Sequence, residues 1–167
     1  TFQYPEGLTT NKHEEDNESY AHVELTDTNH KGNVIVWVKD APKGKKGKVV
    51  TTLAEWIESD TRFNSAIILD TTLGGKPAKK ILLQIPKKMI IVGTLSDGLL
   101  FTVDGDLNDA DYWTPIHTRI TDSFQFTSPK DAEINVGQPA TDKSTQPAVN
   151  EPVSGVEEAV DEEEIIE

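Results

Sequence analysis

The longest dense run of apolar, strand-forming residues lies at positions 79–104. Two apolar runs within it, at 81–85 and 89–95, are bounded by turn residues, and Asp97-Gly98 separates the second from a third. An Asp-Gly pair between apolar segments is a strong hairpin signal, because a type I′ turn needs positive φ at both central positions. The pattern therefore predicts an antiparallel β core.

Shorter patterns predict further strands on both sides of this core. Residues 20–26 alternate apolar and polar side chains, as a half-buried strand does, and residues 33–38 are apolar at nearly every position, as a central strand is. Residues 66–69 predict a brief strand, and the alternation over 116–126 predicts one or two closing strands. The intervening residues 105–115 are expected to form a loop. We expect six to eight strands in all.

One short helix is predicted over residues 52–60. Thr52 and Glu55 have the S/T-x-x-E spacing of a capping box, in which each side chain bonds a free backbone N–H of the first turn. Apolar residues then recur at i, i+3 and i+4, so they share one face of a helix.

These elements predict one mainly antiparallel β domain over residues 18–130, a small barrel or sandwich with an OB-like barrel as the preferred form. The 167-residue, 18.4 kDa chain has room for one such domain. The polar residues 1–17 are expected to form a flexible arm. Residues 131–155, rich in Pro, Ser, Thr and Gln, are expected to be a flexible linker, and residues 156–167 an acidic tail.

Composition excludes several classes of protein. The absence of cysteine rules out a disulfide scaffold, thiol catalysis and cysteine-ligated zinc. No apolar run approaches the roughly 20 residues of a membrane span, and the first residues lack the basic start and apolar stretch of a signal peptide. We therefore expect a soluble, cytoplasmic protein, in the host cytoplasm if the protein is viral.

Charge is distributed unevenly along the chain. The net charge is −13, which for the whole chain argues against a nucleic-acid partner. Residues 31–100, however, carry twelve basic side chains against six acidic ones, whereas the segments on both sides are acidic. A basic centre is therefore expected to lie between acidic ends.

A calcium loop is disfavoured. Asp104, Asp106 and Asn108 match the first three ligand positions of such a loop. The required glycine is replaced by Asp109, and Pro115 stands where the bidentate glutamate belongs.

Other catalytic and metal-binding patterns are also missing. No serine or threonine lies in a nucleophile-elbow context, and the carboxylate pairs fall in polar loops, where their pKa values are expected to be ordinary. The glycine-rich LGGKPAKK segment lacks the spacing of a phosphate-binding loop. The histidines lack the close pairing of a metal site and are expected at the surface: His13, His22, His30 and His117. We expect neither enzyme activity, nor a metal, nor a cofactor.

A basic β body with available aromatic rings suits single-strand binding, because a charged groove follows the phosphates while rings stack on the bases. Nine lysines are expected to contact phosphates: Lys43, Lys45, Lys46, Lys48, Lys76, Lys79, Lys80, Lys87 and Lys88. The candidate stacking residues are Trp37, Tyr112 and Trp113. The alternative is structural, since strand tryptophans commonly pack into cores and lysines commonly protect sheet edges.

A compact body, a Pro/Gln/Ser linker and an acidic tip resemble the layout of bacterial and phage single-stranded DNA-binding proteins, chiefly over residues 136–167. The resemblance implies a replication role in which the tail recruits partner proteins and competes with nucleic acid for the basic groove. The expected tail contacts are Val156, Val160, Ile165 and Ile166.

The alternative function is a virion structural or decoration protein, or an acidic inhibitor that binds a host protein. The sequence leaves open the oligomeric state and the preference for DNA or RNA.

Overall fold

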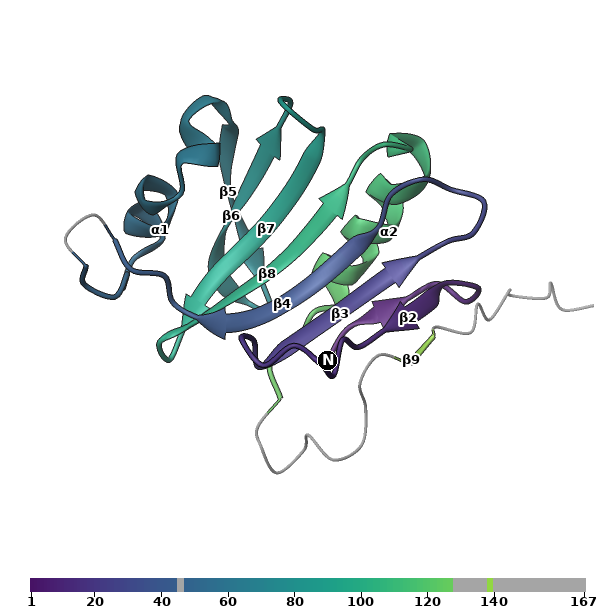
Figure 1. The fold of residues 1–167 in the computed structure, drawn as a ribbon, viewed down its shortest axis with the longest axis horizontal. Coiled ribbons are helices and arrows are strands. Elements are labelled where there is room, and N and C mark those ends of the chain that lie inside the picture. Colours follow the sequence, from purple (N-terminus) through teal and green to yellow (C-terminus); the bar gives the residue numbers. More distant parts are fainter. Residues whose placement is uncertain (45–46, 128–137, 140–167) are drawn as a thin grey trace, which may run out of the picture.

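The computed structural model describes residues 1–44, 47–127 and 138–139. Its centre is a seven-stranded antiparallel sheet in the order β2-β3-β4-β8-β7-β6-β5 (Figure 1). Its strands are β2 (Thr9–Asn11), β3 (Ala21–Thr26), β4 (Val34–Asp40), β5 (Ile67–Leu73), β6 (Lys76–Leu83), β7 (Met89–Ser96) and β8 (Leu99–Asp106). The remaining elements are β1 (Gln3–Tyr4) paired in parallel with β9 (Gln138–Pro139), the helices α1 (Leu53–Ser59) and α2 (Ala110–Ser123), and the 3-10 helix η1 (Thr61–Ser65).

The mainly antiparallel β fold predicted from the sequence is confirmed. The turn between β7 and β8 places Asp97 at φ 55° and Gly98 at φ 79°, as the predicted hairpin requires. In the described part of the chain, β2 and β5 end the sheet and do not pair with each other. The sheet is therefore open, and closure into an OB-like barrel is not confirmed.

The predicted helix at residues 52–60 is confirmed as α1. The Thr52 side chain accepts a hydrogen bond from the Glu55 backbone N–H (3.2 Å), and the Glu55 carboxylate accepts one from the Thr52 N–H (3.1 Å). Trp56 anchors the helix in an apolar core with η1. This core lies on one face of the sheet and contains Val50, Trp56, Phe63, Ile81, Leu83, Ile91 and Leu100.

The expectation of a loop over 105–115 and closing strands over 116–126 is wrong, because α2 occupies most of this segment. The apolar alternation that suggested strands also fits a helix: Trp113, Ile116 and Ile120 are spaced i, i+3 and i+7 and are all buried. They pack on the opposite face of the sheet from α1 (Figure 1). The pattern fits both a strand and a helix, and the segment forms a helix because its apolar face is buried against the sheet, a long-range interaction.

The two helices leave part of the sheet uncovered. On β3 and β4, alternate residues such as Val23 and Val36 point into the core beneath α2, so their neighbours His22 and Trp37 point to the other face. None of the helices described by the structure covers that second face at β3 and β4 (Figure 1).

Residues 1–17, expected as an arm, contain β1 and β2, and β2 pairs with β3 at the edge of the sheet. Apart from β9, residues 131–155 and the tail 156–167, with all its expected contact residues, lie outside the described residues. In the described part of the chain, no helix is long and apolar enough to cross a membrane.

Candidate binding surface

The structure distributes the candidate lysines over separate parts of the sheet. Lys43 and Lys48 lie in the loop after β4, which begins at the end of the sheet where β7 turns into β8. Lys87 and Lys88 precede β7 at the opposite end. The eight residues of β7 separate the two ends by about 25 Å at ~3.4 Å per residue. Lys45 and Lys46 lie outside the described residues.

The lysines of β6 do not complete a common groove. Lys79 and Lys80 are consecutive strand residues and so point to opposite faces. Lys79 pairs with Asp70 (2.5 Å between Nζ and Oδ1), and Lys76 donates to the Ser96 hydroxyl (2.5 Å). Lys87, in turn, pairs with a carboxylate, Asp106, at 2.5 Å. The seven candidate lysines that the structure describes therefore do not form one surface.

The three aromatic candidates also lie in different parts of the structure. Trp113 is fully buried, and its indole N–H donates to the Lys31 carbonyl (3.0 Å), so its ring belongs to the core. Tyr112 stacks on His30 (3.6 Å between ring centroids) and donates its hydroxyl proton to Asp27 (2.9 Å). Only Trp37, of the three candidates, lies half-buried on the uncovered face.

Trp37 is the centre of a row of side chains on β3 and β4, here called the Trp37 row. His22 lies opposite it on β3, with ring centroids 3.6 Å apart, and His13 stacks on His22 at 4.0 Å. The Lys39 ammonium lies 4.3 Å from the centroid of the Trp37 ring, a position favoured by the ring's negative face. The Trp37 row thus joins two imidazoles, an indole and a cation.

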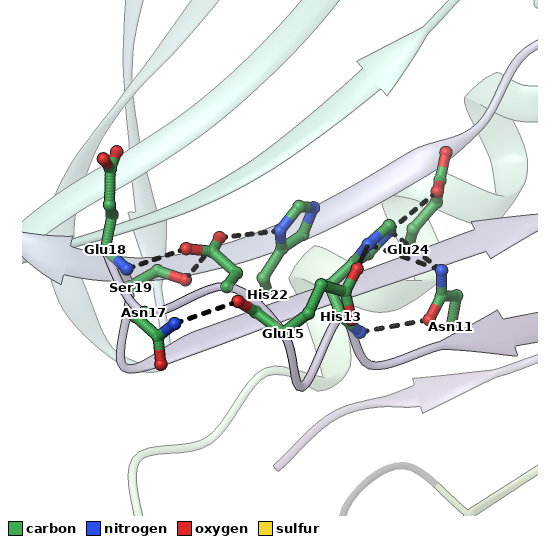
Figure 2. Close-up of polar contacts among 9 residues, drawn as sticks. Asn11, His13, Glu15, Asn17, Glu18, Ser19, His22 and Glu24 are labelled. Carbon is green, nitrogen blue, oxygen red and sulfur yellow. Dashed lines mark hydrogen bonds and ion pairs between the residues drawn. The ribbon is translucent and has the colours of Figure 1, made fainter.

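Carboxylates hold His13 in this row (Figure 2). Its Nδ1 lies 2.8 Å from Glu15 and its Nε2 lies 3.0 Å from Glu24 on β3. These hydrogen bonds, led by the one that Glu24 accepts, raise the pKa of His13, because the protonated ring can donate from both nitrogens. These two contacts hold the segment after β2 against β3.

A third carboxylate, that of Asp16, holds the same segment farther along the chain. Asp16 accepts hydrogen bonds from the Glu18 N–H (2.8 Å) and the Ser19 hydroxyl (2.9 Å), and it lies 2.9 Å from Nδ1 of His22. These bonds, chiefly that from the Glu18 N–H, lower the pKa of Asp16. Within the described residues, no three histidine or carboxylate side chains are arranged to hold a metal ion.

The sequence did not predict the positions of these histidines. His13 was expected in a mobile arm, but the hairpin of β2 and β3 brings it against Glu24. His117 was expected at the surface but is buried beneath β8, where its Nε2–H donates to the Val103 carbonyl (2.9 Å). Burial lowers the pKa of His117 to about 4, so the ring is neutral near pH 7.

A cleft of about 310 Å³ lies beside the Trp37 row, between it and α1–η1. Asp104 of β8 lines this cleft, and its Oδ1 is shielded from solvent without a hydrogen-bond partner in the described part of the chain. Burial raises the pKa of Asp104 to about 6, although Lys39 and Arg62 lie near enough to favour its charged form. The sequence marked Asp104 only as part of the disfavoured calcium pattern and did not predict its burial, because the shielding comes from elements distant in the chain.

The other residues that line the cleft are charged or apolar side chains and two threonines, one proline and one serine. Two further carboxylates line the cleft. Asp40 accepts a hydrogen bond from the Tyr20 hydroxyl (3.0 Å), and Asp60 is bound by the Arg62 guanidinium, with Nε to Oδ2 at 2.9 Å. Its lining contains no histidine and includes the apolar side chains of Trp56 and Phe63. A carboxyl with a raised pKa suggests a functional site only when reacting groups converge on it, and the charged groups beside Asp104 in this cleft are Lys39, Asp40, Asp60 and Arg62.

Comparison with known protein families finds none that matches this chain, and comparison with curated proteins finds no match.

Proposed function

We propose that the protein is a non-enzymatic single-stranded nucleic-acid-binding protein whose binding surface is the Trp37 row and the basic loop that follows β4. One observation carries the proposal: a half-buried tryptophan stands on an uncovered sheet face with a lysine over its ring. Bases stack on such rings in a sequence-tolerant way, while basic side chains track the backbone.

The geometry suggests how one nucleotide binds. A base takes the place of the Lys39 ammonium over the Trp37 ring, while His22 remains stacked on the indole. The displaced Lys39 then contacts a phosphate, and Lys43 and Lys48 of the following loop contact the next ones. An OB-like barrel, the form expected from the sequence, binds single strands across a comparable strand surface.

The surrounding carboxylates limit this surface. Asp16, Glu24 and Asp104 lie on or beside the same face, so we expect only the phosphates near Lys39, Lys43 and Lys48 to be held. Each phosphate contact with a single strand contributes about −0.7 to the slope of log affinity against log salt. Three contacts predict a slope of about −2, smaller than nine lysines would produce.

The order of a β domain, a Pro/Gln/Ser-rich segment and an acidic end supports a role like that of phage single-stranded DNA-binding proteins. A phage-type protein of this kind works in the host cytoplasm, and its acidic tail recruits replication proteins through Val156, Val160, Ile165 and Ile166. The competing function, a virion structural protein or an inhibitor of a host protein, is favoured by the exposed edge of β5.

Titration of a labelled oligothymidylate, followed by fluorescence anisotropy at low and moderate salt, tests the proposal. We expect Trp37→Ala to weaken binding about tenfold, because stacking contributes about 1–3 kcal/mol per base, and Lys39→Ala to weaken it less and to reduce the salt slope. Lys88→Ala is the matched control, since it removes a lysine from the far end of the sheet. Absence of binding even at low salt would favour the competing function.

Tryptophan fluorescence gives an independent readout. Trp56 and Trp113 are buried, so of the three tryptophans Trp37 is the one exposed to a base. Oligonucleotide should therefore quench wild-type fluorescence but not that of the Trp37→Ala variant. Equal quenching in both proteins would place the nucleic acid elsewhere.

A further inference from the structure

The strand β5 is an exposed edge of the sheet. It is seven residues long and last in the strand order, and no strand in the described residues pairs with its outer side. Ile67 and Leu69 are 55% and 48% exposed and, being two residues apart, point to the same face. The strand thus presents free backbone groups together with an apolar row.

β5 lacks the features that usually protect an edge strand. Such strands are commonly short, or carry lysine, proline or a bulge that blocks pairing with another chain. The sequence of β5, IILDTTL, contains neither lysine nor proline. Its one charged residue, Asp70, is paired with Lys79 of β6.

The opposite edge of the sheet is different. β2 has three residues, Thr9–Asn11, all of them polar and exposed. Of the two edge strands in the described chain, only β5 offers a long apolar pairing surface.

We propose that β5 pairs antiparallel with β5 of a second copy of this chain, which joins the two sheets in a twofold-symmetric dimer. The strand is self-complementary when Leu69 lies opposite Leu69 of the other copy. In that register Ile67 lies opposite Thr71, and Ile68 lies opposite Asp70, so the two Asp70 side chains do not face each other.

This register favours a second copy of the chain as the partner that pairs with the free edge of β5. Ile67 and Leu69 of both chains come together on one face and remove each other from water. The pairing closes after two copies, because each chain uses the same edge and the β2 edge is short and polar. The surface is independent of the proposed nucleic-acid site, since β8, β7 and β6 lie between β4 and β5.

Sedimentation equilibrium of the full chain tests the dimer. We expect a concentration-dependent species of twice the 18.4 kDa chain mass, favoured by added salt because each copy carries a net charge of −13. Leu69→Lys should yield a monomer with an unchanged circular dichroism spectrum. Ile85→Lys, which replaces an 80% exposed apolar side chain outside the strands, should leave the dimer intact. A monomeric wild-type protein, larger species without a dimer, or a dimer that survives Leu69→Lys would overturn the proposal.

The absence of cysteine allows a direct test of register. In the proposed dimer the Leu69 Cα atoms are about 4.5–5.5 Å apart, as opposite residues of an antiparallel pair are, which a disulfide can span. With oxidised glutathione accepting the two electrons and two protons, Leu69→Cys should cross-link the copies. Thr72→Cys, offset from its counterpart in this register, should not. Failure of Leu69→Cys to cross-link, or equal cross-linking of both variants, would contradict the register.

Discussion

Asp104 and His117 are two titratable side chains, shielded by the fold, that make opposite contributions to the pH dependence of folding. Burial raises the pKa of Asp104 from 3.8 to about 6, so its contribution to stability is lost as pH rises through this interval. Burial lowers the pKa of His117 from 6.5 to about 4, so its contribution is lost as pH falls through that interval. The two effects partly cancel, and only variants separate them.

We predict that Asp104→Asn raises the free energy of unfolding at pH 7.5 by about 1–3 kcal/mol, because the neutral amide avoids burial of a charge. At pH 4 the wild-type carboxyl is protonated in the folded state, so the difference should fall below about 1 kcal/mol. Urea unfolding of both proteins at the two pH values measures this. Asp122→Asn, at an exposed position of α2, is the control and should change little at either pH; an equal gain for Asp104→Asn at both would contradict burial as the cause.

At the scale of elements, α1 and α2 form for different reasons: local capping for α1 and burial against the sheet for α2. α1 begins with a capping box, so its start is encoded in four consecutive residues. The N-cap residue of α2, Asp109, makes no side-chain capping bond, and the helix contains Pro115. α2 is therefore held mainly by the burial of Trp113, Ile116 and Ile120 against the sheet.

We predict that Thr52→Ala destabilises the protein by about 1 kcal/mol, because the Glu55 N–H loses its acceptor at the start of α1. Thr52→Ser keeps the hydroxyl and should cost little. Chemical denaturation of the two variants, compared with wild type, gives the difference. A Thr52→Ser variant as unstable as Thr52→Ala would show that the lost methyl group, and not the cap, matters.

At the scale of the whole molecule, charge and β structure divide the chain into regions of different character. The basic loop after β4 extends from the Trp37 row, while β5 exposes an almost uncharged edge at the other side of the sheet. Residues 131–155 are expected from the sequence to be a flexible linker, and a short flexible linker gives a tethered segment such as 156–167 a millimolar effective concentration near its own domain.

We predict that deletion of residues 151–167 tightens oligonucleotide binding several-fold at low salt, because the tail competes with phosphates for the lysines. The gain should shrink as salt screens both interactions. Anisotropy titrations of the truncated and full chains measure the effect. A variant that keeps the tail length but has glutamine in place of its acids should bind like the truncated protein; equal binding by all three would exclude a competing tail.

The sequence by itself determined the features that depend on neighbouring residues. The β7–β8 hairpin follows from Asp97-Gly98, since few other residues adopt the positive φ of a tight turn. The helix α1 follows from Thr52 and Glu55. The antiparallel class of the sheet follows from short apolar runs joined by such turns.

Only the tertiary structure decided the features that depend on residues distant in the chain. The segment containing Trp113 fits both strand and helix periods, and packing against the sheet selects α2. The lysines cluster in sequence, yet strand direction and alternation send them to different ends and faces. Strand pairing brings His13 to the Trp37 row. Packing of distant elements shields the Asp104 carboxylate from water. Local preferences specify turns and caps, whereas the neighbours of a side chain across the sheet are set by the long-range burial of apolar surface.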